Sequence, residues 1–329
     1  MEKFTNSIEP TANPELERRI RARLDSLTKP PGSLGRLESL ALQLGLIQQT
    51  EIPSTGRKSM AIFCADHGIV EEGVSPYPCE VTRQMAANFR AGGAAISVLC
   101  RHYGIEPVII DMGVGAPTKN FAREPAMTRE RAEHAMAEGM RYADGADLIG
   151  AGEMGIGNTT SAAALLSAFS GLDPSETAGR GTGLDDAGVA RKIEVIRRAL
   201  TLHKPDPADP LGVLAAVGGF EIAAIAGLIL GAASRRRMIV LDGFISCSAA
   251  LVARGIARAA MDYVVFSQRS AERGHQRMLE FLDARPLFDL DLRLGEGTGA
   301  AIGMNLVEAS IKLYREMATF KSAGVSGRD

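Results

Sequence analysis

Two loops rich in glycine and threonine have the residue types that bind an anion. The first, "GIGNTT", covers Gly155–Thr160, and the second, "GTG", covers Gly181–Gly183. Each precedes a predicted helix, and free backbone N–H groups at a helix N-terminus bind phosphate. No Walker lysine accompanies the first loop, so the pattern indicates one monoester phosphate rather than hydrolysis of a nucleoside triphosphate. A glycine-rich turn capped by Thr159 is the structural alternative.

One carboxylate lies in an unusual setting. Glu296 stands in "LRLGEGTGAA", residues 292–301, among glycines and small apolar residues, with Arg293 as the nearest basic residue. Burial disfavours the charged form of a carboxyl group and raises its pKa, which makes a better proton acceptor near neutral pH. Glu296 is therefore the first candidate for a general base, and Glu153, at the end of a predicted strand, is the second. The alternative is a turn acid that pairs with Arg293.

The helix predicted after the second loop begins with two acids, Asp185 and Asp186. Paired carboxylates can bind a metal ion, but acids in this position more often cap a helix. We therefore expect capping and no metal site. Lys192 lies in the second turn of the same helix, where a lysine by itself is expected to face solvent.

The stretch "GAGEMG", Gly150–Gly155, matches the dinucleotide fingerprint G-x-G-x-x-G after a predicted strand. The following helix begins only after Gly157, which is late for that turn, and Asp173 lies in a turn instead of at a strand end. Two alternative functions stay open on these residues. One is an NAD-dependent oxidoreductase that uses this loop, and the other is a non-enzymatic small-molecule-binding protein.

Composition excludes several classes of function. The chain has 329 residues, a net charge of -2, 36 glycines and no tryptophan, which leaves neither a basic footprint nor stacking platforms for nucleic acid. Its four cysteines form no C-x-x-C pair, and His67 with Cys64 and Cys79 does not match the zinc deaminase spacing. We expect reduced thiols in a cytoplasmic protein, and the polar N-terminus shows no signal peptide.

One apolar segment, residues 211–233, is long enough to raise the question of a membrane span. Glu221 is its one charged residue, and Gly218-Gly219 interrupts it in the middle. A strand pattern follows directly, so we expect a loop, a turn at the glycines and a buried helix, with no membrane contact. Gly227 and Gly231, four residues apart, would allow that helix to lie close to a sheet or to a partner helix.

Short apolar runs that alternate with helical patterns predict an α/β fold between residues 59 and 300. The expected architecture is a parallel Rossmann-like sheet flanked by helices, with ligands at the carboxyl ends of the strands. Residues 1–58 and 301–329 lie outside this alternation and are expected to form a smaller helical domain. A helix with Ser33 as N-cap is expected within the first of these segments.

Several stretches together resemble one enzyme family, nicotinate-nucleotide:dimethylbenzimidazole phosphoribosyltransferase. They occur in the family's order from about residue 28 to 305, and they read "TKPPGSLGRLE", "ADHGIVEEGVSPYP", "EVTRQM", "DMGVG", "GEMGIGNTTSAAAL", "GRGTGLDD", "LDGFISCSAAL" and "LRLGEGTGAA". Two positions depart from the family pattern. Cys79 replaces a glutamine and Gln268 replaces a histidine, so the preferred acceptor base is left open.

The resemblance implies the reaction and its participants. The family joins nicotinate mononucleotide to 5,6-dimethylbenzimidazole, giving α-ribazole 5′-phosphate and nicotinate, in assembly of the nucleotide loop of cobalamin. It implies no cofactor, because a neutral pyridine ring leaves without help from a metal ion, and it implies a homodimer. Glu296 and Glu153 would be the catalytic residues. The substrate-binding residues would be Ser75, Tyr77, Gln84, Gly155, Gly157, Asn158, Thr159, Thr160, Gly181, Thr182, Gly183, Lys192, Asp242, Gly243, Ser270, Gly295 and Gly297.

Overall fold

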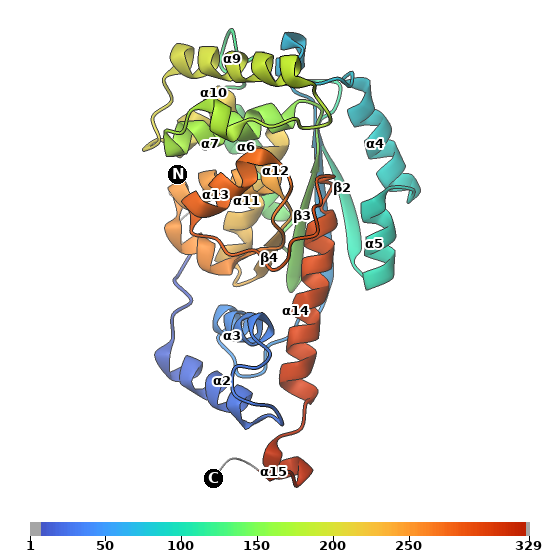
Figure 1. Ribbon diagram of the computed structural model, residues 1–329, viewed down its shortest axis with the longest axis vertical. Coiled ribbons are helices and arrows are strands. Elements are labelled where there is room, and N and C mark those ends of the chain that lie inside the picture. The colour runs from blue at the N-terminus through green and yellow to red at the C-terminus, as the bar shows by residue number, and fades with distance from the viewer. Residues whose placement is uncertain (1–7, 327–329) are drawn as a thin grey trace.

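The protein contains one parallel five-stranded sheet, seen nearly edge-on in Figure 1. The computed structural model describes residues 8–326. The strand order is β2-β1-β3-β4-β5, and every neighbouring pair is parallel. The strands are β1 (Lys58–Ala65), β2 (Glu106–Gly113), β3 (Leu148–Met154), β4 (Met238–Leu241) and β5 (Val264–Phe266). The prediction of a parallel α/β fold is confirmed.

The inner strands are apolar on both faces because helices cover both faces. Strands β1, β3 and β4 are almost entirely buried, whereas the edge strand β2 is partly exposed. In the register of the sheet, Cys64 of β1 lies opposite Met154, but Leu241, the last residue of β4, lies opposite Ala151. Strand β3 therefore continues three residues beyond this pair. That difference leaves space beside its carboxyl end for loops from elsewhere in the chain.

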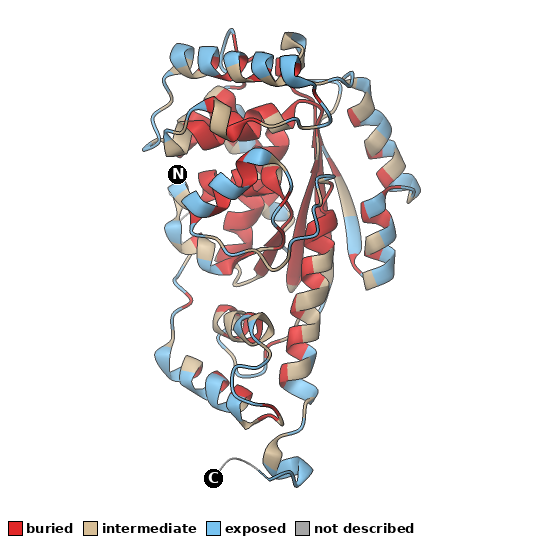
Figure 2. Cartoon of the chain, viewed as in Figure 1, coloured by how far each residue is buried: buried red, intermediate tan, exposed pale blue. Residues whose placement is uncertain are grey.

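Helices on one side of the sheet form most of the core (Figures 1 and 2). They are α6 (Arg129–Arg141), α7 (Asn158–Ser170), α10 (Pro210–Val217), α11 (Phe220–Ser234) and α12 (Phe244–Ile256). On the other side lie α4 (Glu80–Ala91) and α5 (Ala95–Tyr103), and α14 (Thr298–Glu316) contacts both α5 and β3. Two further helices are α9 (Asp186–His203) and α13 (Arg273–Leu282), and the short elements between strands are η1 (Gly68–Glu72), α8 (Pro174–Thr177) and η2 (Arg258–Tyr263).

The apolar segment 211–233 contains the predicted turn and the predicted buried helix, but a second buried helix, α10, replaces the loop expected before the turn. Helix α10 ends at Val217, α11 begins at Phe220, and no helix within residues 8–326 is long and apolar enough to cross a membrane. Helix α11 packs against α6 at backbone contact distance. A Cβ added at Gly227 would lie 1.9 Å from the carbonyl oxygen of Met136. The close helix contact expected from the small residues thus occurs within one chain.

Helices from the first and last parts of the described chain lie together below the sheet in Figure 1. Helices α2 (Pro14–Ser26) and α3 (Arg36–Gln48) pack on each other, α14 contacts α3, and α15 (Phe320–Ala323) follows. The expected N-cap at Ser33 is wrong. Helix α3 begins at Arg36 after Gly35, whose φ of +53° suits glycine. Because α14 contacts both β3 and α3, it connects the sheet to these helices, and the domain boundaries near residues 58 and 301 stay a prediction.

Candidate active site

A cavity of about 420 Å³ lies at the carboxyl ends of the strands. Its walls come from α4, from the segments that follow β3, β4 and β5, and from the loop before α14. Many of the predicted site residues line it, as expected for a parallel sheet. These are Tyr77, Glu153, Gly155, Asn158, Thr159, Gly181, Thr182, Gly243, Ser270, Gly295 and Glu296.

The loop after β3 presents the N-terminus of α7 to this cavity. Gly157 is the N-cap residue, with φ of +96°, and the helix begins at Asn158. In the described chain no side chain caps this helix end, so capping by Thr159 is wrong. The cavity wall includes Gly155, Asn158 and Thr159. An uncapped helix N-terminus in a cavity wall is a suitable place for a phosphate.

Glycine is required in this loop for packing as well as for backbone conformation. A Cβ at Gly155 would lie 2.6 Å from the carbonyl oxygen of Ala65, and one at Gly157 would lie 2.7 Å from Val70 Cγ2. Behind the loop, both ring nitrogens of His67 form hydrogen bonds with buried side chains. Its Nε2 lies 2.7 Å from Glu221 Oε1 and its Nδ1 lies 3.1 Å from Ser161 Oγ. These contacts fix the side chain of His67, against which the loop packs.

Lys192 of α9 is buried, so the expectation of a solvent-facing side chain is wrong. Its ammonium group donates to Thr159 Oγ1 at 3.1 Å and to the carbonyl oxygen of Gly179 at 3.3 Å. Burial lowers the pKa of Lys192 to about 8, and the carboxylate of Glu272 partly opposes this shift. Both hydrogen-bond acceptors are neutral, so the ammonium retains a third N–H for an anion bound at Thr159.

The Glu296 loop has a strained backbone. Three consecutive residues have positive φ: Gly295 at +82°, Glu296 at +66° and Gly297 at +97°. Glutamate rarely adopts this conformation, and such outliers persist only where the surroundings enforce them. Here the loop lies against β3, because a Cβ at Gly152 would be 2.3 Å from the carbonyl oxygen of Glu296.

Asp242, directly after β4, fastens the Glu296 loop to the sheet. Its carboxylate accepts hydrogen bonds from the N–H groups of Gly297 and Gly299, both at 2.9 Å, and from Gln268 Nε2 at 2.8 Å. Burial raises its pKa to about 6, while these donors act in the opposite direction. Asp242 therefore positions the loop and does not itself line the cavity, and its role in substrate binding stays a prediction.

Glu296 itself lines the cavity and is only 6% exposed, which does not fit a surface turn acid. Burial raises the pKa of its carboxyl group, the charge of Asp242 adds to this, and the N–H of Ile96 at the start of α5 opposes it. Its Oε2 atom has no hydrogen-bond partner in the described part of the chain. A desolvated carboxylate with a free oxygen is well suited to accept a proton from a ligand.

The second carboxyl group, Glu153, adjoins the first. A Cβ at Gly295 would lie 2.6 Å from Glu153 Oε1, so the two carboxyl groups lie on segments in direct contact. Burial raises the pKa of Glu153 to about 8, with further contributions from the charges of Asp242 and Glu221, although Asn158 Nδ2 donates to its Oε2 at 2.5 Å. At pH 7 Glu153 is therefore mostly protonated and acts as a hydrogen-bond donor more readily than as a base.

The structure does not bring every predicted residue into the cavity wall. The residues outside it are Ser75, Gln84, Gly157, Thr160, Gly183, Lys192, Asp242 and Gly297. Ser75 lies at the rim, with its Oγ 3.4 Å from Thr182 Oγ1. Gln84 is exposed, because the face of α4 that lines the cavity carries Val81 and Met85, one turn apart.

Sequence reasoning missed most of the apolar wall and part of the polar wall. The missed residues are Val81, Met85, Met154, Ile156, Phe244, Ile245, Gln268, Glu272, Arg293 and Leu294. The one available signal was the helical spacing of Val81 and Met85, because apolar residues after strands are not distinguishable from core residues by type alone.

The dinucleotide fingerprint is not formed. Gly150 and Gly152 lie inside strand β3 and pair with Met60 and Ile62 of β1, so they make no turn around a pyrophosphate. Asp173 caps α8 and forms an ion pair with Arg197. Asp185 caps α9, as predicted. The NAD alternative is therefore wrong on geometry.

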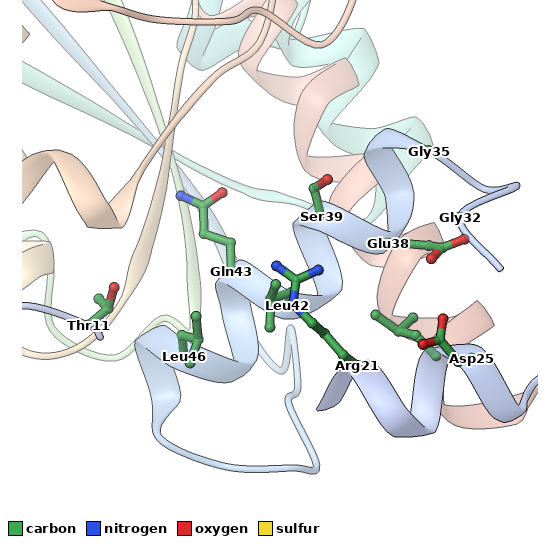
Figure 3. Close-up of a pocket in the computed structure, with 11 residues that line it drawn as sticks. Thr11, Arg21, Asp25, Gly32, Gly35, Glu38, Ser39, Leu42, Gln43 and Leu46 are labelled. Atoms are coloured by element: carbon green, nitrogen blue, oxygen red, sulfur yellow. The ribbon is translucent and has the colours of Figure 1, made fainter. Parts of the chain in front are cut away.

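A second cavity, of about 440 Å³, lies between α2 and α3 and is shown in Figure 3. Arg21 extends from α2 toward α3 in this view, and Asp25 of α2 and Glu38 of α3 also line the cavity. All of its lining residues fall between Thr11 and Leu46, so none comes from a strand end. Glu153 and Glu296, two carboxyl groups whose pKa values are raised by burial, line the first cavity together with Gly295 of the strained loop. The first cavity is therefore the candidate active site.

Comparison with known proteins finds similarity over almost the whole chain. A family model described as phosphoribosyltransferase matches residues 9–325. Among curated proteins, nicotinate-nucleotide–dimethylbenzimidazole phosphoribosyltransferase from Chloroflexus aggregans is 50% identical over 93% of this chain and 92% of its own length. The protein of the same name from Cupriavidus necator is 51% identical, over 97% and 96%. The crystal structure of CobT from Thermus thermophilus matches with a TM-score of 0.92 at 44% identity, covering 96% of this chain and all of that one.

Proposed function

Because the chain belongs to the nicotinate-nucleotide–dimethylbenzimidazole phosphoribosyltransferase family, we infer that it transfers the 5-phosphoribosyl group of nicotinate mononucleotide to 5,6-dimethylbenzimidazole. The products are α-ribazole 5′-phosphate and nicotinate, and the reaction serves cobalamin biosynthesis. One observation carries the assignment of the site: a buried carboxylate with a free oxygen, Glu296, faces the same cavity as an uncapped helix N-terminus.

The donor phosphate binds at the N-terminus of α7. The N–H group of Thr159 and the hydroxyls of Thr159 and Thr182 supply neutral donors, because the N–H groups of Asn158 and Thr160 already donate to the carbonyl oxygens of Gly155 and Gly157. Lys192, held against Thr159, supplies the positive charge. A monoester phosphate needs no more than this, because helix N–H groups and one cation together satisfy its oxygens.

The acceptor base occupies the apolar part of the cavity. Tyr77, Val81 and Met85 from the α4 side, together with Leu294, form a wall that suits a flat aromatic ring. One ring nitrogen attacks C1′ of the ribose, the bond from C1′ to the pyridinium nitrogen breaks, and nicotinate departs with that electron pair. Glu296 accepts the proton of the other ring nitrogen, so charge does not build up on the new base.

Glu153 assists without acting as the base. Its pKa of about 8 keeps the carboxyl group mostly protonated at pH 7. In that form it adds no negative charge beside the donor phosphate and offers a hydrogen bond that orients the donor. Asn158, which contacts both Glu153 and the phosphate loop, links the two parts of the site.

The test is a product assay with both substrates. Purified protein is incubated with nicotinate mononucleotide, with and without 5,6-dimethylbenzimidazole, and nicotinate and α-ribazole 5′-phosphate are quantified by chromatography. We expect nicotinate release only when the second substrate is present. Release of nicotinate without 5,6-dimethylbenzimidazole would contradict the transferase and favour a hydrolase. Tight binding of both compounds with no product would favour the non-enzymatic binding protein.

We further propose a cytoplasmic homodimer in which residues 1–58 and 301–329 form a small helical domain. All four cysteines are free thiols, which agrees with a reducing compartment. The proposal of a dimer depends on the family resemblance alone, because Gly227 and Gly231 pack against α6 of the same chain and are not available for a partner helix. Light scattering at micromolar concentration is expected to give twice the mass of one chain, and a single-chain mass would reject the dimer.

A further inference from the structure

Gln268 follows strand β5 and is only 1% exposed, yet one of its side-chain atoms is unsatisfied. Its Nε2 donates to Asp242 Oδ1 at 2.8 Å. Its Oε1 has no hydrogen-bond partner among the residues that the structure describes. The residue also lines the active-site cavity beside Gly243 and Ser270. A buried amide oxygen without a donor is unfavourable, so such an atom indicates a missing partner.

The orientation of the amide is determined by its neighbour. Turned the other way, Oε1 would lie against Asp242 Oδ1, and two acceptors at 2.8 Å repel each other. Asp242 Oδ1 already accepts from the N–H of Gly299, so it needs a donor and not a second acceptor on this side. The amide therefore presents an acceptor to any ligand that reaches it.

Few groups of the two substrates can satisfy that acceptor. The phosphate dianion and the nicotinate carboxylate are themselves acceptors. The single ring N–H of the benzimidazole is the proton that Glu296 removes. The remaining donors are the ribose hydroxyls of the donor nucleotide. Gln268 follows β5, the edge strand of the sheet, whereas Val81 and Met85 belong to α4, which follows β1. Strands β3 and β4 lie between β1 and β5. An acceptor ring held by Val81 and Met85 therefore lies away from Gln268.

We propose that Gln268 is a substrate-binding residue whose Oε1 accepts a hydrogen bond from a ribose hydroxyl of nicotinate mononucleotide. The proposal rests on the transferase function inferred above. The same side chain also positions the catalytic loop, because its Nε2 shares Asp242 with the N–H groups of Gly297 and Gly299. Gln268 thus connects recognition of the sugar to the loop that carries the general base.

The histidine that the family often has at this position can perform the same two tasks. An imidazole that donates one N–H to Asp242 presents its other nitrogen as an acceptor. A methionine has similar length but offers neither a strong donor nor a strong acceptor. Gln268→His and Gln268→Met therefore form a matched pair, and Gln276→Met on the exposed face of α13 is the control for a general glutamine effect.

The experiment compares nicotinate mononucleotide with its 2′-deoxy and 3′-deoxy forms. For the wild type we expect one deoxy donor to lose at least about tenfold in kcat/KM, the size of one buried hydrogen bond. In Gln268→Met that loss should shrink to within about threefold, whereas Gln268→His and Gln276→Met should retain it. A looser Glu296 loop would lower the rates with all donors alike, so the ratio between donors isolates the hydroxyl contact.

Two results would overturn the proposal. One is an equal ratio between donors in the wild type and Gln268→Met. The other is a higher KM for dimethylbenzimidazole in Gln268→Met with the hydroxyl ratio unchanged, which would assign Oε1 to the base. Failure of the proposed function gives a different result, namely no turnover of the parent substrates by the wild type. In that case donor affinities from calorimetry, with the same three donors and variants, make the same comparison.

Discussion

The ammonium group of Lys192 lies 3.1 Å from Thr159 Oγ1, although the two residues come from different helices and are 33 positions apart. The contact places a positive charge directly behind the hydroxyl at the N-terminus of α7. Because Lys192 is buried, its charge is poorly hydrated and interacts strongly with an anion that enters the cavity.

Replacing this lysine should weaken donor binding. We expect Lys192→Met to raise the KM for nicotinate mononucleotide by about tenfold to a hundredfold, the range for a buried charge-assisted hydrogen bond. The KM for dimethylbenzimidazole should change little. Lys312→Met, an exposed lysine on α14, is the control and should leave both KM values unchanged. An unaltered donor KM in Lys192→Met would place the phosphate elsewhere.

The KM for the donor should also depend on pH. Burial lowers the pKa of Lys192 to about 8, so its ammonium loses a proton as pH rises through that value. We expect the wild-type donor KM to rise above about pH 8, and the higher pKa that Lys192 has beside a bound phosphate dianion sets the pH at which this rise ends. Steady-state kinetics between pH 7 and 10 measure it. A profile of the same shape in Lys192→Met would assign the titration to another group.

Glu296→Gln keeps the size of the side chain but cannot accept the ring proton. General-base steps contribute about 10²–10⁴-fold, and we expect kcat to fall within that range while both substrates still bind. Glu316→Gln, an exposed acid at the end of α14, should behave as the wild type. Saturation kinetics with both substrates are the measurement, and a kcat within about threefold of the wild type would remove Glu296 from the role.

Glu153 should make the unliganded protein less stable as pH rises. Its pKa is about 8 in the folded protein and about 4.5 in the unfolded chain. Between these values the folded state holds the proton more tightly, so stability is greatest below the unfolded pKa and is lost as pH rises through 8. Glu153→Gln should remove up to about 4 kcal/mol of this pH dependence. Urea unfolding at pH 5, 7 and 9 compares the two proteins, and parallel curves would contradict the prediction.

Gly157 and Gly171 stand at the two ends of α7, and both have positive φ, at +96° and +74°. Alanine at either position is strained by about 1 kcal/mol. At Gly157 its Cβ would also meet Val70 at 2.7 Å, whereas nothing lies within 4 Å at Gly171. We expect Gly157→Ala to destabilise the protein more than Gly171→Ala and, alone of the two, to raise the donor KM. Thermal unfolding measures the loss of stability and steady-state kinetics measure the donor KM. Equal effects of the two variants on both quantities would argue against a role of the Gly157 loop in donor binding.

Much of the fold was predictable because local patterns determine it. The apolar runs that alternate with helical patterns predicted the parallel sheet, and the Gly218-Gly219 break predicted the turn before α11, although a loop was expected where α10 forms. The Gly155–Thr160 loop and Glu296 were predicted site residues on residue type, because glycines next to hydroxyls or to a lone acid are uncommon in core elements, and the structure brings both to one cavity. The N-cap of α3 was misplaced because Ser33 lies in a turn that Gly35 ends.

The sequence by itself therefore determined the order of the elements and the residues whose side chains could bind or react, since both depend on neighbours along the chain. The tertiary structure alone decided which of these residues act together. Asp242 was expected to bind substrate, but the early end of β4 turns its carboxylate to the N–H groups of Gly297 and Gly299. Lys192 was expected in solvent, but packing of α9 buries it at Thr159. Burial and contacts between distant segments set these roles, and neither is a property of a residue's neighbours in sequence.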